Sequence, residues 1–117
     1  MEFKIYNLPD LTSEERDKLS NFILDSPEST IFHTIEWNEL LSEINHNSDE
    51  KIKFLIIKDL DEIIGFFPFL NINKKWFLNY NYSPPTKYET TYGGPIFRGN
   101  KNLFYEIIKY LNNYFGI

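Results

Sequence analysis

Residues 52–72 read IKFLIIKDLDEIIGFFPFLNI, and most of the predicted architecture follows from this segment. Two apolar, β-prone runs, 52–58 and 63–72, flank the acidic segment 59–62, a pattern that predicts a β-hairpin. The second run is apolar almost without interruption, which indicates a strand that is buried on both faces. Pro68 cannot donate to a β-ladder, so we expect a bulge or a transition to a sheet edge there.

A strand and a helix are predicted at the start of the chain. Residues 2–6 alternate polar and apolar side chains, as a half-buried strand does. Thr12 and Glu15 have the spacing of a capping box, which predicts a helix over about residues 13–25. The apolar stripe of this helix consists of Leu19, Phe22 and Ile23.

A second helix is predicted to begin after Thr34, a good N-cap residue that follows an extended segment, 30–33. Its apolar face has the helical spacing i, i+3, i+4 and i+7. That face is formed by Trp37, Leu40, Leu41 and Ile44. The opposite, solvated face carries Glu36, Glu39 and Glu43.

The remaining elements complete an α+β order. We expect a strand over residues 76–80, an irregular segment over 81–91, a tight turn over 92–95 and a last helix from about Lys101. Gly116 occupies the usual position after a helix end. The order β, α, α, β, β, β, α predicts an antiparallel meander covered by helices. Such a helix ordinarily returns into the sheet, so we expect a chain truncated before its next strand.

The composition restricts the class of protein. With 117 residues, the segment 1–117 fits a single domain. The formal net charge of −5 disfavours a nucleic acid as the main partner. The chain has no cysteine, which excludes thiolate nucleophiles and Cys-ligated metals. No apolar run approaches the roughly 20 residues of a membrane span, and we expect a cytoplasmic protein without membrane contact.

Three motifs resemble the FemAB-like family of the GNAT acyltransferase superfamily. Residues 26–37 (SPESTIFHTIEW) are similar to the family's turn and helix with an early tryptophan. Residues 61–68 (DEIIGFFP) resemble its hairpin, and residues 92–95 (YGGP) match a recurring motif. The three motifs occur in the family's order, together with the same predicted order of elements.

The resemblance implies a GNAT-like fold, as the first half of a tandem architecture. Family members transfer an acyl or aminoacyl group to an amine, with acetyl-CoA or aminoacyl-tRNA as the donor. The first half shapes the acceptor cleft, and the second half is the likelier donor site. Segment 97–100 only faintly resembles the phosphate-gripping loop of CoA-binding GNAT domains, so no cofactor is expected in this chain. His33-Thr34 and Leu41 also depart from the bridge-forming members, which disfavours a UDP-linked murein precursor.

The resemblance places five residues at the border of the acceptor cleft: His33, Trp37, Tyr92, Gly93 and Gly94. Each has a structural alternative, because an isolated histidine often caps a helix and a glycine pair often forms a turn. No catalytic residue is assigned. No metal site is assigned either, because two histidines thirteen residues apart lack neighbouring carboxylates.

Two functions remain open. The chain is either the acceptor-side portion of an N-acyltransferase or aminoacyltransferase, inactive alone, or a non-catalytic binding or assembly module that self-associates. The first hypothesis predicts an amine-bearing small molecule or a cell-wall-type acceptor as partner, and a missing C-terminal half. The second depends on the aromatic stretch from Trp76 to Tyr82, whose rings could bind a ligand or protein or simply pack on the sheet.

Overall fold

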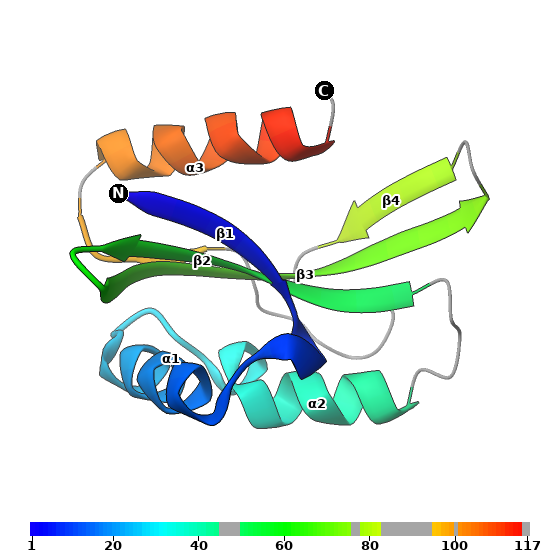
Figure 1. Ribbon diagram of the computed structural model, residues 1–117, viewed down its shortest axis with the longest axis horizontal. Coiled ribbons are helices and arrows are strands. Elements are labelled where there is room, and N and C mark those ends of the chain that lie inside the picture. Colours follow the sequence, from blue (N-terminus) through cyan, green and yellow to red (C-terminus); the bar gives the residue numbers. More distant parts are fainter. Residues whose placement is uncertain (45–49, 76–77, 83–94, 100, 116–117) are drawn as a thin grey trace.

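The computed structural model describes residues 1–44, 50–75, 78–82, 95–99 and 101–115. It is an α+β fold in which an antiparallel sheet lies between helices (Figure 1). The strands are β1 (Glu2–Asn7), β2 (Glu50–Asp59), β3 (Glu62–Lys75), β4 (Leu78–Tyr82) and β5 (Ile96–Phe97). The helices are α1 (Ser13–Asp25), α2 (Ile35–Ile44) and α3 (Lys101–Phe115), with 3-10 turns η1 (Leu8–Asp10) and η2 (Ile31–His33).

The sheet is built around the long strand β3. Its strands follow the order β1-β2-β3-β4, and all neighbours are antiparallel. Gly65 and Phe66, near the start of β3, pair with the short strand β5. The end of β3 pairs with β4 instead, so one edge of β3 serves two partners in succession. The predicted meander is therefore confirmed, with β5 as an unpredicted addition.

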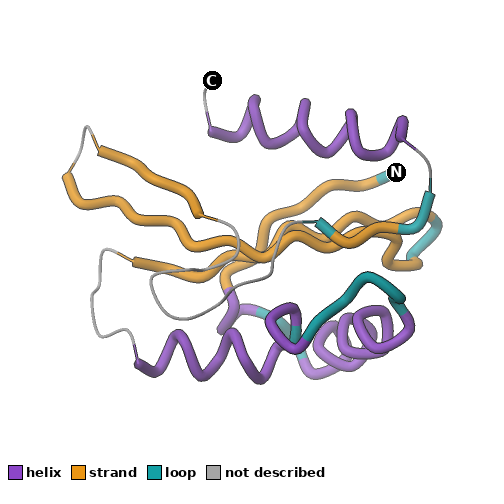
Figure 2. Tube along the Cα trace, turned by 180° about the vertical axis from the view of Figure 1, so that it is seen from behind, coloured by secondary structure: helices purple, strands orange, loops and turns teal. Residues whose placement is uncertain are grey.

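Helices cover both faces of the sheet. Figure 1 shows α1 and α2 on one face and α3 on the other, and Figure 2 shows the same arrangement from behind. Phe54, Ile56 and Phe66 belong to the apolar core beneath α1 and α2. Leu55, Ile57 and Phe69 belong to a second core beneath α3. The apolar run in β3 is thus buried on both faces, as its composition predicts.

The central hairpin differs from the prediction at Pro68. Pairing with β2 continues through this residue, which lies opposite Phe54. The expected bulge lies earlier instead, because β3 holds one extra residue, Ile64, where the register shifts between Ile57 and Lys58. Among the described residues, β5 pairs with β3 only up to Phe66, and the pairing of β3 with β4 begins at Leu70 of β3.

The first helix agrees with its prediction in bounds and in capping. Glu15 N donates to Thr12 Oγ1 at 3.1 Å, and Thr12 N donates to Glu15 Oε1 at 2.9 Å. Both bonds of the capping box are present, so two amide groups of the first turn are satisfied locally. The helix buries the predicted stripe of Leu19, Phe22 and Ile23.

The predicted bounds of some other elements differ from the structure, and some predicted features lie outside the described residues. Strand β4 runs to Tyr82, beyond the predicted end at residue 80, while residues 76–77 of the predicted strand lie outside the described residues. The last helix begins at Lys101 as predicted. Tyr92, Gly93, Gly94 and Gly116 lie outside the described residues. Within the described part of the chain, no helix is long and apolar enough to cross a lipid bilayer.

Candidate functional site: the η2–α2 corner

Two of the predicted site residues, His33 and Trp37, lie where η2 passes into α2. The sequence predicts an extended segment here, but residues 31–33 form a 3-10 turn. Thr30 explains the difference, because its Oγ1 accepts the amide of Phe32 at 3.2 Å. His33 N also donates to the Thr30 carbonyl oxygen at 3.0 Å. We call residues 30–38 the η2–α2 corner.

His33 is a buried member of this corner. Its side chain is 2% exposed. Nδ1 accepts the backbone amide of Thr30 at 3.0 Å, so the neutral ring carries its proton on Nε2. His33 takes part in the capping box of η2, whereas the structural alternative predicted from the sequence is a cap of the second predicted helix. Nδ1 is engaged by the backbone and is not available as a general base.

The start of α2 is held by Thr34. Its Oγ1 accepts the amide of Trp37 at 3.2 Å, as the N-cap prediction requires. The hydroxyl also donates to the carbonyl oxygen of Ile31 at 2.6 Å, which joins the cap of α2 to the preceding turn. Thr34 thus fixes the angle between η2 and α2.

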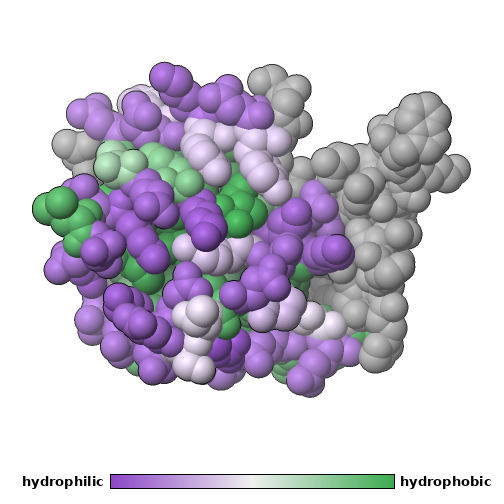
Figure 3. Space-filling model, viewed as in Figure 1, coloured by the Kyte–Doolittle hydropathy of each residue, from purple (hydrophilic) through white to green (hydrophobic). Residues whose placement is uncertain are grey.

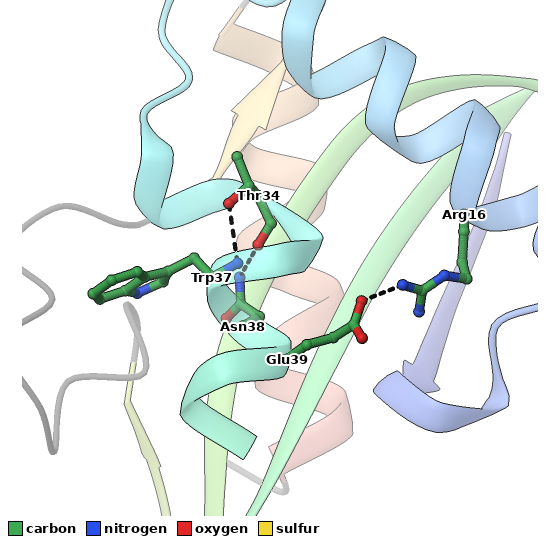
Figure 4. Close-up of polar contacts among 5 residues, drawn as sticks. All are labelled: Arg16, Thr34, Trp37, Asn38 and Glu39. Carbon is green, nitrogen blue, oxygen red and sulfur yellow. Dashed lines mark hydrogen bonds and ion pairs between the residues drawn. The ribbon is translucent and has the colours of Figure 1, made fainter. Parts of the chain in front are cut away.

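Helix α2 is rotated relative to the predicted apolar face. Leu40 and Ile44 are exposed, whereas the buried positions are Ile35, Asn38 and Leu41. The spacing rule failed because a polar residue, Asn38, occupies the centre of the buried face. Glu39, predicted on the solvated face, keeps 40% of its side chain exposed and forms an ion pair with Arg16 of α1 (Figure 4).

Asn38 is the functional candidate that the sequence did not reveal. The side chain is fully buried, at 0% exposure. Its Nδ2 donates to the Thr34 carbonyl oxygen at 2.8 Å and lies 3.4 Å from that of Phe32. Its Oδ1 has no hydrogen-bond partner among the described residues. A buried acceptor without a partner is rare and costs free energy, so a donor group is its chemical complement.

Trp37 forms the outer wall of the corner. Figure 4 shows its indole pointing away from Arg16, while Glu39 reaches towards that residue. The indole ring meets the ring of Phe32 edge to face, with centroids 5.3 Å apart. Trp37 is half-buried and packs against the core beneath α1 and α2.

The corner contains no described cluster that suits a metal ion. Among the residues that the structure describes, no group of three or more His, Asp or Glu side chains comes together. The structure brings His33 and Trp37 together with Asn38. How Tyr92, Gly93 and Gly94 relate to them lies outside the described residues.

Comparison with protein-family models, with curated proteins and with solved structures finds no match. The chemistry assigned to the corner therefore depends on its own residues and on the motifs quoted above.

Proposed function

We propose that this chain is the N-terminal, acceptor-side portion of a FemAB-like N-acyltransferase or aminoacyltransferase, the first of two GNAT-like halves. Three ordered motifs and the antiparallel α+β architecture support the proposal. In this proposal the η2–α2 corner borders the cleft for an amine-bearing small molecule or a cell-wall-type acceptor.

The reaction joins an amine to an activated carboxyl group. The ammonium group of the acceptor first loses a proton, and its nitrogen then attacks the carbonyl carbon of a thioester or an RNA ester. A C–N bond forms, the C–S or C–O bond breaks, and the leaving group takes up a proton. Because no covalent nucleophile is required, catalysis depends on orienting the two substrates and on stabilising the oxyanion.

One observation carries the proposal: the buried Oδ1 of Asn38 has no partner among the described residues. An amine or ammonium group is a hydrogen-bond donor that matches this oxygen. Trp37, the neighbour of Asn38 in the chain, contributes an aromatic ring that packs edge to face with Phe32. The contact would position the acceptor without itself moving a proton.

The donor site is proposed to belong to the second half, outside these 117 residues. Within the described corner, His33 Nδ1 accepts a backbone amide and is therefore not placed to take a proton from the acceptor. The isolated chain is therefore expected to bind an acceptor amine without transferring an acyl group to it.

The experiment pairs a binding assay with a transfer assay on the same preparation. Trp76→Phe leaves Trp37 as the sole tryptophan, whose emission then reports on the corner. We expect saturable quenching by the amine-bearing peptide Nα-acetyl-Lys-D-Ala-D-Ala amide and none by its Nε-acetylated form. With acetyl-CoA added, no acetylated peptide should appear. Equal responses to the two peptides, or turnover, would contradict the proposal.

The alternative function is a non-catalytic module that self-associates, and one observation favours it. Phe104, Tyr105 and Ile108 of α3 are 40%, 64% and 41% exposed. The ring centroids of Phe104 and Tyr105 are 6.1 Å apart, so the two rings form a joint surface. Figure 3 also shows apolar surface in the band between α3 and the sheet.

Light scattering after size-exclusion chromatography tests this alternative. A dimer that becomes a monomer in the Phe104→Ser, Ile108→Ser variant would support it. A monomeric parent chain would contradict it.

A further inference from the structure

A concave site lies away from the η2–α2 corner, at the end of the sheet where the β2–β3 hairpin turns above α1 (Figure 1). The cavity has a volume of about 280 Å³ and is open to solvent. Its rim carries one cationic group from the segment after β5 and carboxylates from α1 and the hairpin. These residues are Arg98, Asp25, Asp61 and Glu62, above a floor that includes Phe22.

Arg98 is held in place by contacts that include no ion pair with a described carboxylate. Its backbone N donates to the Ile64 carbonyl oxygen at 2.8 Å, which fixes the main chain against the bulge of β3. Its guanidinium carbon lies 5.1 Å from the ring centroid of the buried Phe22. None of the described carboxylates lies within ion-pair distance of Arg98. A stacked, planar guanidinium is prepared for bidentate contact with a carboxylate.

The acidic side of the cavity attracts the opposite charge. Asp25 is the last residue of α1, and the last turn of this helix contains no basic residue. An anion at this helix end is unfavourable because the helix dipole is negative there, so a bound cation would relieve the repulsion. Asp61 and Glu62 of the hairpin line the same cavity. The one lysine on the rim, Lys18, is already paired with Glu14 at 3.2 Å.

We propose that this cavity binds a small zwitterion, of the size of an amino acid or dipeptide, through both of its charges. The carboxylate of the ligand contacts the guanidinium of Arg98, and its ammonium group lies among Asp25, Asp61 and Glu62. A ligand with a single charge contacts either Arg98 or the carboxylates, and leaves the other group without an oppositely charged contact. The proposal does not depend on the function proposed for the η2–α2 corner, because the two sites share no residue.

The test uses three related ligands and the full chain. Glycylglycine carries both charges, N-acetylglycylglycine lacks the ammonium group, and glycylglycine amide lacks the carboxylate. In ¹H–¹⁵N correlation spectra we expect saturable shifts at Asp25, Ile63 and Arg98 with glycylglycine. Each singly charged ligand should bind at least about tenfold more weakly, the loss expected for one charge-assisted contact.

Two variants complete the test. Arg98→Gln should weaken glycylglycine binding at least about tenfold. Lys109→Gln, which removes a charge of the same sign from α3, outside the cavity, should leave binding unchanged. Both positions are exposed, and unchanged spectra away from the cavity will show that each variant is folded. Equal binding of the three ligands, no saturable shift, or equal losses in the two variants would overturn the proposal.

Discussion

Gly65 lies directly opposite Ile57 in the β2–β3 pair, and a β-carbon on Gly65 would stand 2.7 Å from Cδ1 of Ile57. Both residues are buried. The glycine therefore allows the isoleucine side chain to lie across the neighbouring strand. This contact sits beside the bulge at Ile64, where β3 changes register.

Gly65→Ala should destabilise the fold by about 1–3 kcal/mol, because the added methyl group overpacks the core beneath α3. Ile57→Val removes the atom that would clash, so the double variant should recover part of this loss beyond additivity. Urea unfolding of the parent, the two single variants and the double variant measures the coupling. Strict additivity would show that the clash is relieved elsewhere.

Asn38→Asp is nearly isosteric and tests the hydrogen bonds of the η2–α2 corner. The amide donates towards two carbonyl oxygens, those of Thr34 and Phe32, and an ionised carboxylate cannot donate to either. We expect a loss of about 3 kcal/mol or more at pH 7, because an unpaired buried charge results.

The loss in Asn38→Asp should shrink as the pH falls, because burial raises the pKa of the new carboxyl group in the folded state. Its protonated form can donate to Thr34. The stability of the variant is therefore highest below the unfolded pKa of about 3.9, and it falls as the pH rises from there through the raised folded pKa. Thermal unfolding from pH 7 to pH 3 measures this dependence. A pH-independent loss would contradict the assigned orientation of the amide.

The capping box of α1 makes the stability sensitive to acid. The backbone amide of Thr12 lowers the pKa of Glu15 below its ordinary value of 4.5. A carboxyl group with a lowered folded pKa stabilises the fold above the unfolded pKa, and this contribution disappears as the pH falls through the folded pKa. The free energy of unfolding of Glu15→Gln should therefore fall less than that of the parent between about pH 5 and pH 3.

Chemical unfolding at a series of pH values gives this comparison. Glu14→Gln is the matched control, since Glu14 is the neighbouring acid and lies outside the capping box. If the control changes the acid dependence as much as Glu15→Gln does, the effect belongs to net charge and not to the cap.

The backbone at the tip of the β2–β3 hairpin has a conformation that another residue type would adopt more easily. Leu60 and Asp61 have positive φ values of 50° and 67°, and Leu60 is 93% exposed. For leucine this conformation is unfavourable by about 1 kcal/mol or more, whereas asparagine adopts it more easily. Leu60→Asn should raise the free energy of unfolding by about 0.5–1 kcal/mol, measured by urea titration. A loss of stability would show that the exposed leucine makes contacts that offset its strain.

Local signals predicted the fold where one residue pattern had one structural solution. The Thr12–Glu15 spacing gave the start of α1, since both capping bonds depend on neighbours within the first turn. The central hairpin was predictable for a similar reason, because one short acidic turn segment separates two apolar, β-prone runs. The short strand β5 has only two residues and no such pattern.

The corner was harder to predict because its order depends on tertiary packing. The sequence shows Leu40 and Ile44 as apolar, yet α2 buries Asn38 in place of both. The available signal was the position of Asn38, which lies at helical spacing between Ile35 and Leu41. Because asparagine is polar, the apolar pattern did not include this position. Thr30 likewise folds the predicted extended segment into a turn through side-chain bonds that a propensity rule does not contain.

The most direct test of the proposed acceptor site is a ¹H–¹⁵N titration of the chain with Nα-acetyl-Lys-D-Ala-D-Ala amide. This ligand offers an amine without a carboxylate, so binding in the zwitterion cavity should be weak, and its shifts would map to Asp25, Ile63 and Arg98 and not to the corner. We predict saturable shifts of the His33, Trp37 and Asn38 amides, and none with the Nε-acetylated ligand. Shifts that are absent, that map to α3, or that are the same for both ligands would contradict an acceptor-amine site at the η2–α2 corner.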